Sequence, residues 1–224
     1  MSPRHIARFI GAAVVTTWAL LIAPIGIPSA SAGPCPDVEV VFARGTNEPP
    51  GVGGIGQAFV DSLRAQVGAK SVGVYAVNYP ASTDFPTAVD GVNDAGAHVR
   101  YMAANCPNTR MVLGGFSQGA AVIGFVTAAV VPDGVVASDV PGPMPPAVAD
   151  HVAAVALFGK PSSRFMSAIG APPIAIGPLY AAKTTDLCAP NDPICSDQGD
   201  MSAHGLYAAD GMVGQAATFA TSRL

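Results

Sequence analysis

Short apolar runs alternate with longer amphipathic stretches along most of this chain. Residues 38–43, 72–77, 110–115 and 152–158 are nearly continuous runs of apolar side chains. Such runs are typical of parallel strands whose two faces are both buried. A weaker run covers residues 181–187. The pattern therefore predicts five strands.

Helical periodicity fills the intervals between these strands. Apolar side chains recur every fourth residue in 53–67, and residues 87–105 and 118–130 are Ala-rich or apolar helical stretches. A last helix is expected from about 204 to 223. Strands that alternate with helices predict a three-layer α/β/α sandwich around a central, mainly parallel five-stranded sheet.

Two connections are rich in Pro and Gly and are expected to be surface loops, residues 133–150 and 165–180. The second is the most apolar loop after the N-terminal segment. Two interpretations stay open for it: a loop packed on its own domain, or a flap that faces an acyl chain.

The N-terminal segment has the pattern of a secretory signal. Two arginines and no acid occur in the first eight residues, residues 9–27 are mostly apolar, and residues 30–32 are Ala-Ser-Ala. The apolar run is long enough for a transmembrane anchor, but Pro and Gly interrupt its second half. We expect a cleaved signal peptide at 1–32 and one secreted domain at 33–224.

Composition narrows the class of partner. The net charge is −4, half of the residues are hydrophobic and 12% are charged. This suits a compact fold rather than a disordered chain. Without a basic patch, nucleic acid is not an expected partner.

The four cysteines all follow the expected cleavage site, at Cys35, Cys106, Cys188 and Cys195. An even number in an exported chain indicates two disulfides, for which three pairings are possible. Zinc is the alternative, but there is no C-x-x-C pair and no histidine cluster near the cysteines, so no metal is expected.

Ser117 lies in the motif Gly-Phe-Ser-Gln-Gly at 115–119, between an apolar strand and an apolar helix. A tight strand-to-helix turn of this kind exposes the serine hydroxyl above the sheet and requires glycines on both sides. The alternative is a purely structural turn. The context favours a nucleophile.

A serine nucleophile needs a base, and three histidines follow the signal segment: His98, His151 and His204. His98 falls within a helix that precedes the nucleophile strand, and His151 falls at the start of a strand. His204 follows the last strand, where the chain order of serine, acid and histidine in α/β-hydrolases places the base. We therefore favour His204.

The base needs a carboxylate to orient it. The candidates after the fifth strand are Asp186, Asp192, Asp197 and Asp200. Asp192 leads from spacing, because a short loop between Cys188 and Cys195 could hold it rigidly. The other three stay open at this point.

Four motifs in order resemble the cutinase family: Ala-Arg-Gly-Thr at 43–46, Gly-Phe-Ser-Gln-Gly at 115–119, Asp-Pro-Ile-Cys at 192–195 and Ala-His at 203–204. The chain is most similar to the secreted cutinase-like esterases and lipases of mycobacteria. The resemblance covers nearly all of the chain after the signal and implies an α/β-hydrolase fold of the cutinase type.

The resemblance also implies functional residues. The catalytic acid of the family lies three residues before the last cysteine, which implies a triad of Ser117, Asp192 and His204. It implies disulfides that join Cys35 to Cys106 and Cys188 to Cys195.

An oxyanion hole is expected beside Ser117. The N–H group of Gln118, which follows the nucleophile, is one donor. The second donor in the family is a hydroxyl residue after Arg-Gly, here Thr46. Fungal cutinases have Ser at this place, so the methyl group of Thr46 is a departure.

No cofactor is expected. Residues 51–56 fit the dinucleotide motif G-x-G-x-x-G, but the second strand ends in Asn78 rather than in an acid. The glycines also begin too far from the first strand for a tight turn.

Together these features predict a monomeric secreted serine esterase. Its expected substrates are short- to medium-chain esters or lipids, including lipids at a lipid–water interface. A secreted binding protein that keeps the fold without turnover is the alternative from another class. A phospholipid or thioester is the alternative substrate.

Overall fold

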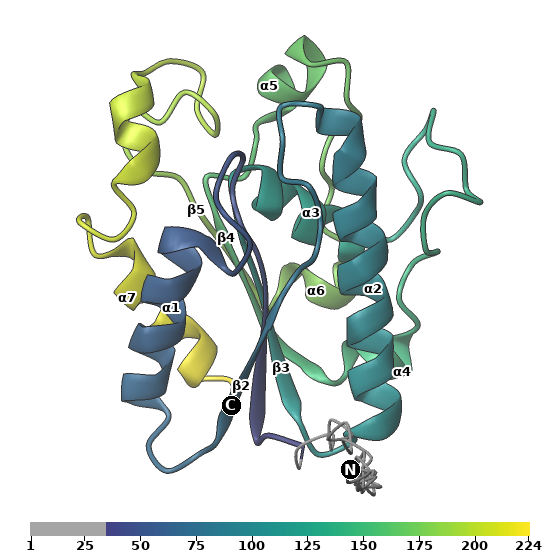
Figure 1. Ribbon diagram of the computed structural model, residues 1–224, viewed down its shortest axis with the longest axis vertical. Coiled ribbons are helices and arrows are strands. Elements are labelled where there is room, and N and C mark those ends of the chain that lie inside the picture. Colours follow the sequence, from purple (N-terminus) through teal and green to yellow (C-terminus); the bar gives the residue numbers. More distant parts are fainter. Residues whose placement is uncertain (1–34) are drawn as a thin grey trace, which may run out of the picture. The chain divides into compact units, whose positions relative to one another are not determined.

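The computed structural model describes residues 35–224, so the expected signal peptide at 1–32 lies outside the described residues. The predicted five-stranded sheet is confirmed, and all of its strands are parallel in the order β2-β1-β3-β4-β5 (Figure 1). The strands are β1 (Val38–Ala43), β2 (Val72–Ala76), β3 (Arg110–Phe116), β4 (Val152–Phe158) and β5 (Thr184–Leu187).

Helices cover both faces of this sheet (Figure 1). The longer helices are α1 (Gly53–Gln66), α2 (Ala88–Asn105), α3 (Gln118–Val126) and α7 (Met212–Thr221). The helices α1 and α7 pack together on one face, and α2 and α3 pack together on the other. The predicted three-layer α/β/α sandwich is therefore confirmed.

Two apolar cores join the layers. Phe42, Phe59 and Phe158 are fully buried between the sheet and α1, with ring centroids 5.8–6.3 Å apart. On the opposite face, Leu113 and Ile123 are fully buried between β3 and α3. Burial of a side chain of this size contributes about 1.5–3 kcal/mol, so these cores fix the position of the strand ends.

The helix predicted over 118–130 ends earlier than expected, at Val126. The Thr127 side chain donates to the carbonyl oxygens of Ile123 and Gly124, at 2.9 and 3.1 Å. The Thr127 carbonyl accepts instead from Gly177 N–H, at 2.9 Å. This contact with a distant loop replaces the next helical hydrogen bond and ends the helix.

The prediction of one continuous helix over 204–223 is wrong. His204 lies in a 3₁₀ helix, η2 (Met201–Gly205), and α7 begins only at Met212. Gly211 separates them with a φ of 74°, a left-handed conformation that glycine adopts at little cost.

The two expected surface loops contain short helices. The segment 133–150 includes α4 (Pro146–Ala149). The segment 165–180 overlaps α5 (Ser163–Ala168) and the start of α6 (Pro178–Ala181), and a short 3₁₀ helix, η1 (Phe85–Thr87), precedes α2. The Pro and Gly content of these segments predicted loops and gave no signal for the short helices within them.

Both cysteine pairings implied by the family resemblance are present. Cys35 is bonded to Cys106, and Cys188 to Cys195, which leaves no free cysteine among residues 35–224. No helix in this described part is long and apolar enough to cross a membrane.

The two disulfides are expected to differ in their contribution to stability. Cys35 and Cys106 are 71 residues apart, whereas Cys188 and Cys195 are 7 apart. Loop-closure entropy predicts that replacing the first pair by serines lowers the free energy of unfolding by about 4 kcal/mol, and the second pair by about 2.5 kcal/mol. Urea unfolding of both double variants measures the difference. Equal losses would contradict the entropic account.

Candidate active site

Ser117 occupies a strained turn between β3 and α3. Its φ of 54° and ψ of −117° are costly for a residue with a side chain, by about 1–3 kcal/mol. Its N–H donates to the carbonyl of Phe158 at 2.9 Å. A Cβ atom on Gly115 would lie 2.2 Å from the Gly119 carbonyl oxygen, and one on Gly119 would lie 1.9 Å from that of Ala43. The turn therefore requires glycine at both positions.

The His204 imidazole contacts the Ser117 hydroxyl and the side chain before it. Its Nε2 lies 2.8 Å from Ser117 Oγ. The ring stacks on Phe116 with centroids 4.8 Å apart and an interplanar angle of 29°. The side chain before Ser117 thus supports the imidazole that the hydroxyl contacts.

Asp192 continues the chain of hydrogen bonds. Its side chain has no exposed surface, and its Oδ2 lies 2.8 Å from His204 Nδ1. Its Oδ1 accepts from Ile194 N–H at 2.9 Å. The loop that carries it is closed by the disulfide between Cys188 and Cys195. The geometry thus brings together the three residues that the family resemblance selected.

The other acids that spacing left open lie in different contacts. Asp186 pairs with Lys160 at 3.3 Å, and burial raises the pKa of Asp186 despite the opposing effect of that lysine. Asp197 is exposed, and its carbonyl accepts from Arg164. The exposed Asp200 accepts from Ser202 N–H at 2.8 Å, and hydrogen bonds from the Ser202 side chain and from this N–H group lower the pKa of Asp200.

The other two histidines are far from this constellation in the fold. His98 Nε2 lies 2.9 Å from Glu39 Oε1, and its ring stacks on Tyr75 with centroids 3.5 Å apart. His151 directly precedes β4, at the end of the sheet opposite Ser117. Neither contacts the serine.

Tyr207 is a further part of the site that the sequence analysis missed. Its buried hydroxyl donates to Asp192 Oδ2, the oxygen that also faces His204, and accepts from Ala189 N–H at 3.3 Å. Burial and this bond to the carboxylate raise the pKa of Tyr207, so it stays a donor. Its spacing of three residues from His204, one helical turn, is the signal that could have identified it.

Gly159, at the end of β4, permits this close arrangement. A Cβ atom there would lie 2.7 Å from the Tyr207 hydroxyl, 3.1 Å from Asp192 Oδ2 and 3.1 Å from His204 Cε1. Its φ of 59° also favours glycine. Because Gly159 has no side chain, the Tyr207 hydroxyl, the Asp192 carboxylate and the His204 ring can all lie close to it.

Thr46 and Gln118, the expected oxyanion-hole residues, lie beside Ser117. Thr46 Oγ1 is 3.4 Å from Gln118 Oε1, and the Gln118 amide donates to the Ser82 carbonyl at 3.1 Å. Both residues line the same groove as Ser117 and His204. The amide of Gln118 thus connects the loop after β1 to the loop before η1.

Buried Arg44 fixes the loop that carries Thr46. Its guanidinium donates to the carbonyl oxygens of Glu48 and Tyr79, at 2.9 and 2.6 Å, and lies 5.1 Å from the centre of the Tyr79 ring. The Tyr79 hydroxyl in turn donates to the Arg44 carbonyl. Such a charge-assisted network holds a loop more firmly than neutral bonds do.

The Glu48 carboxylate joins the loop after β1 to the glycine-rich segment 51–56, which fits the dinucleotide motif. It accepts from Gly45 N–H at 2.6 Å and from Gly54 N–H at 2.7 Å, at the start of α1. A side-chain anion therefore occupies the helix N-terminus that a phosphate would need. Among residues 35–224 no group of three or more His, Cys, Asp or Glu residues could hold a metal.

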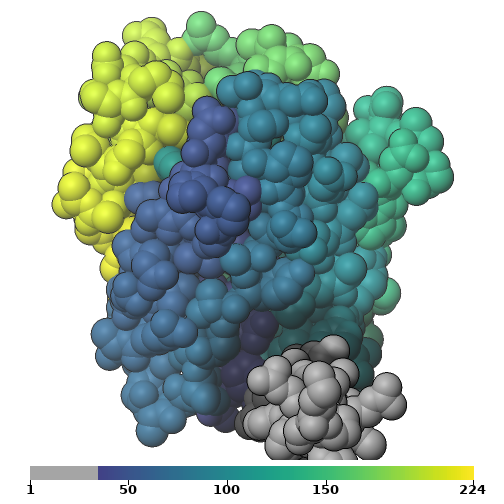
Figure 2. Space-filling view, in the orientation of Figure 1, coloured from purple at the N-terminus to yellow at the C-terminus, as the bar shows by residue number. Residues whose placement is uncertain are grey.

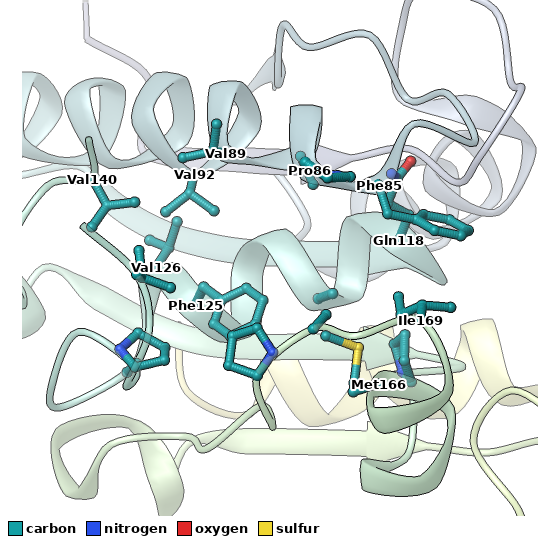
Figure 3. A pocket seen from close by; sticks show the side chains of 18 of the residues that line it. Phe85, Pro86, Val89, Val92, Gln118, Phe125, Val126, Val140, Met166 and Ile169 are labelled. Atoms are coloured by element: carbon teal, nitrogen blue, oxygen red, sulfur yellow. The ribbon is translucent and has the colours of Figure 1, made fainter. Parts of the chain in front are cut away.

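An apolar groove of about 830 Å³ begins at Ser117 and His204. Figure 3 shows its walls: α3 contributes Phe125 and Val126, α2 contributes Val92, and α5 and the turn after it contribute Met166 and Ile169. The volume lies within the range of small-molecule sites. The groove suits an apolar chain attached to a group at Ser117.

The loop at 165–180, for which two interpretations stayed open, packs on its own domain and also borders the groove. Its first part lines the groove with Phe165, Met166 and Ile169. Farther along, Ile174 packs so closely on α3 that a Cβ atom on Gly124 would lie 2.4 Å from it. One end of the loop is thus anchored while the other borders the groove.

Comparison with known proteins identifies the family. The sequence profile described as Cutinase matches residues 34–224. The chain belongs to the cutinase family. It is 55% identical over 227 residues to Carboxylesterase Culp1 of Mycobacterium tuberculosis, covering 100% of this chain and 98% of that protein. It is 53% identical over 213 residues to Phospholipase Culp4 of the same organism, covering 95% and 89%.

A solved cutinase agrees with this assignment. The structure of Trichoderma reesei cutinase in complex with a C11Y4 phosphonate inhibitor is similar with a TM-score of 0.65 and 35% identity. The similarity covers 84% of this chain and 77% of that one. As a member of the cutinase family with an α/β-hydrolase fold, the chain is a carboxylic ester hydrolase.

The Tyr207 hydrogen bond generates a prediction about pH dependence. In Tyr207→Phe, Asp192 loses one donor and holds the protonated His204 ring more strongly. A higher pH is then needed to free the base. The acid limb of kcat/KM for ester hydrolysis is expected to move up by about one to two units, because a hydrogen bond to a charged group is worth about 1.5–3 kcal/mol and one pKa unit about 1.4 kcal/mol.

Tyr75→Phe is the matched control, because the Tyr75 hydroxyl donates to Asp94 at 3.0 Å, remote from Ser117. It should lose stability without moving the acid limb. An unshifted limb in Tyr207→Phe would show that Tyr207 acts only in packing.

Proposed function

We propose that this protein is a secreted serine esterase that hydrolyses short- to medium-chain esters or lipids through a Ser117–His204–Asp192 triad and an acyl-enzyme intermediate. The observation that carries the proposal is the unbroken hydrogen-bond chain from Asp192 through His204 to Ser117, which ends where the apolar groove begins. A nucleophile, a base and an orienting acid at hydrogen-bond distance form the constellation that acyl transfer needs.

In the first half of the reaction, His204 Nε2 takes the proton of Ser117 Oγ as the oxygen attacks the ester carbonyl carbon. A tetrahedral intermediate forms, and its oxyanion is stabilised by donors from Thr46 and Gln118. The protonated ring then gives its proton to the leaving alcohol as the ester C–O bond breaks. The acyl group remains on Ser117.

In the second half, His204 takes a proton from a water molecule that attacks the acyl-enzyme. The new tetrahedral intermediate collapses, the proton returns to Ser117 Oγ, and the carboxylic acid leaves. Asp192 stabilises the imidazolium in both halves and keeps the ring tautomer that presents Nε2 to the serine. Its complete burial strengthens this interaction, because no water screens the charge.

The groove supports an apolar acyl group rather than a polar one. Its walls are mainly Val, Phe, Met, Ile and Pro side chains. The alcohol side is less restricted, so simple esters, acylglycerols and phospholipids with suitable acyl chains all remain within the proposal. The relative named as a phospholipase supports the inclusion of phospholipids.

Export and assembly belong to the same proposal. The signal-like segment 1–32 and two disulfides support an extracellular protein, because disulfides persist in oxidising compartments. The proposed catalytic residues all come from one chain, which is compatible with a monomer.

The nucleophile is tested by covalent labelling and turnover. Wild-type protein should react stoichiometrically with a fluorophosphonate and hydrolyse p-nitrophenyl butanoate, and Ser117→Ala should lose both properties. Asp192→Asn should retain the fold while kcat falls by about 10⁴-fold. Labelling that persists in Ser117→Ala would refute the nucleophile assignment. A stable wild-type protein without turnover would favour a binding role.

The Thr46 hydroxyl is tested separately from its N–H group. Thr46→Val removes the hydroxyl at nearly constant volume and should lower kcat by about 10²-fold, the usual cost of losing one oxyanion donor, with little change in KM. Thr46→Ser keeps the hydroxyl and should stay near wild type. If Thr46→Val matches wild type, the hydroxyl is not a donor.

A further inference from the structure

The far end of the groove is formed by a segment that the sequence analysis treated only as a surface loop. We call residues 139–144 the strap; all six of them line the groove. In the space-filling view, the segment that contains the strap projects beside α2 at the right-hand edge (Figure 2). Val140 of the strap lies close to Val92 and Val126, at the opposite end of the groove from Gln118 (Figure 3).

One face of α2 holds the strap in place through residues at positions i, i+3 and i+7. Asn93 Nδ2 donates to the Asp139 carbonyl at 3.0 Å, and Arg100 donates to the Gly142 carbonyl at 2.5 Å. Gly96 lies between them. These spacings place all three residues on the same side of the helix.

Gly96 lets the strap approach the helix closely. A Cβ atom there would lie 3.0 Å from Pro141 Cγ and 3.7 Å from Met144 Cε. Met144 is only 5% exposed, although the neighbouring residues 142–143 and 145–147 are exposed. The strap is therefore hydrogen-bonded to α2 at Asp139 and Gly142 and packs on α2 through Pro141 and Met144.

The position of the strap sets the length of the groove. On α3, groove-lining residues run from the first residue, Gln118, to the ninth, Val126, a rise of about 12 Å along the helix. An extended alkyl chain advances roughly 1.3 Å per carbon for a C–C bond of about 1.5 Å, so about nine or ten carbons reach from Ser117 to the strap. A four-carbon acyl group ends well before it.

From this geometry we propose that Asn93 and Arg100 are specificity-determining residues, which set the longest acyl chain that the groove accepts by fixing the strap as its distal wall. They act by positioning, since neither lines the groove. The inference rests on the proposed esterase function and adds to it the residues that set its chain-length preference.

The test compares p-nitrophenyl butanoate, decanoate and hexadecanoate in wild type, Asn93→Ala and Arg100→Met. In wild type, kcat/KM should peak at decanoate. In both variants it should fall for decanoate by about tenfold, mainly through KM, since contacts to one or two methylenes are worth at least that factor. Hexadecanoate should gain relative to decanoate. The butanoate rate should change less than about twofold, because that chain does not reach the strap.

Arg110→Met is the matched control. Arg110 also donates to a loop carbonyl, that of Asp150 at 2.7 Å, but at the far end of the sheet from Ser117. It should leave the chain-length profile unchanged. Arg100→Lys, which keeps a donor, should restore part of the decanoate preference. Thermal unfolding checks that each variant is folded. If Arg100→Met is not folded, the test is made with Asn93→Ala alone.

Unchanged ratios among the three esters in Asn93→Ala and Arg100→Met, in an enzyme that is active through Ser117, would overturn the role of the strap and leave the proposed function standing. An equal loss for all three esters would also overturn it. Absence of Ser117-dependent hydrolysis of butanoate in wild type would instead refute the proposed function itself.

Discussion

A carboxylate without exposed surface is the constraint around which the site is arranged. Removing the Asp192 charge from water costs several kcal/mol unless donors replace the lost hydration. Three donors do so: Ile194 N–H, the His204 ring and the Tyr207 hydroxyl. They come from the Asp192 loop itself, from η2 and from the turn after it. Holding one buried charge therefore fixes three segments of the chain relative to one another.

The strained turn at Ser117 makes a second demand on the same sheet edge. Its positive φ persists because Gly119 packs directly on the end of β1 and because Ser117 N–H is bonded to the end of β4. Both strands are buried on both faces, so the turn has little freedom to relax. Burial in the apolar cores of the sandwich thus offsets the energetic cost of two features at this edge, a strained backbone at Ser117 and a buried charge at Asp192, both of which the proposed mechanism uses.

Local pattern predicted the sheet well and the segment ends less well. The bounds of β1 and β4 match the apolar runs, because strands buried on both faces have a sharp compositional edge. The early end of α3 depends on a bond between Thr127 and Gly177, fifty residues apart, which no local pattern contains. The break before α7 depends on one glycine, Gly211, in a stretch that otherwise has helical composition.

The residues of the candidate site also differ in how well the local sequence could predict them. The turn around Ser117 has a local signature, whereas one acid within the last strand and three after it were all candidates for the orienting carboxylate. Family resemblance singled out Asp192, and the fold explains that choice, because Asp192 alone among them is fully buried beside His204. The one local signal of Tyr207 was its spacing of three residues from His204. Gly159 acts through tertiary contacts, so composition and spacing gave it no distinct signal. The role of a Pro- and Gly-rich loop as a groove wall was hidden for the same reason.

In the proposed mechanism, reaction and selectivity rest on different parts of the molecule. The Ser117–His204–Asp192 hydrogen bonds depend on strand ends and on a loop closed by a disulfide, while the strap depends on two side chains of α2. A loop held on a rigid scaffold can change without disturbing the scaffold. Substitutions on α2 can therefore move the distal wall while the hydroxyl, imidazole and carboxylate keep their distances. Under the proposed function, this separation would let acyl-chain selectivity change while the Ser117–His204–Asp192 hydrogen bonds stay intact.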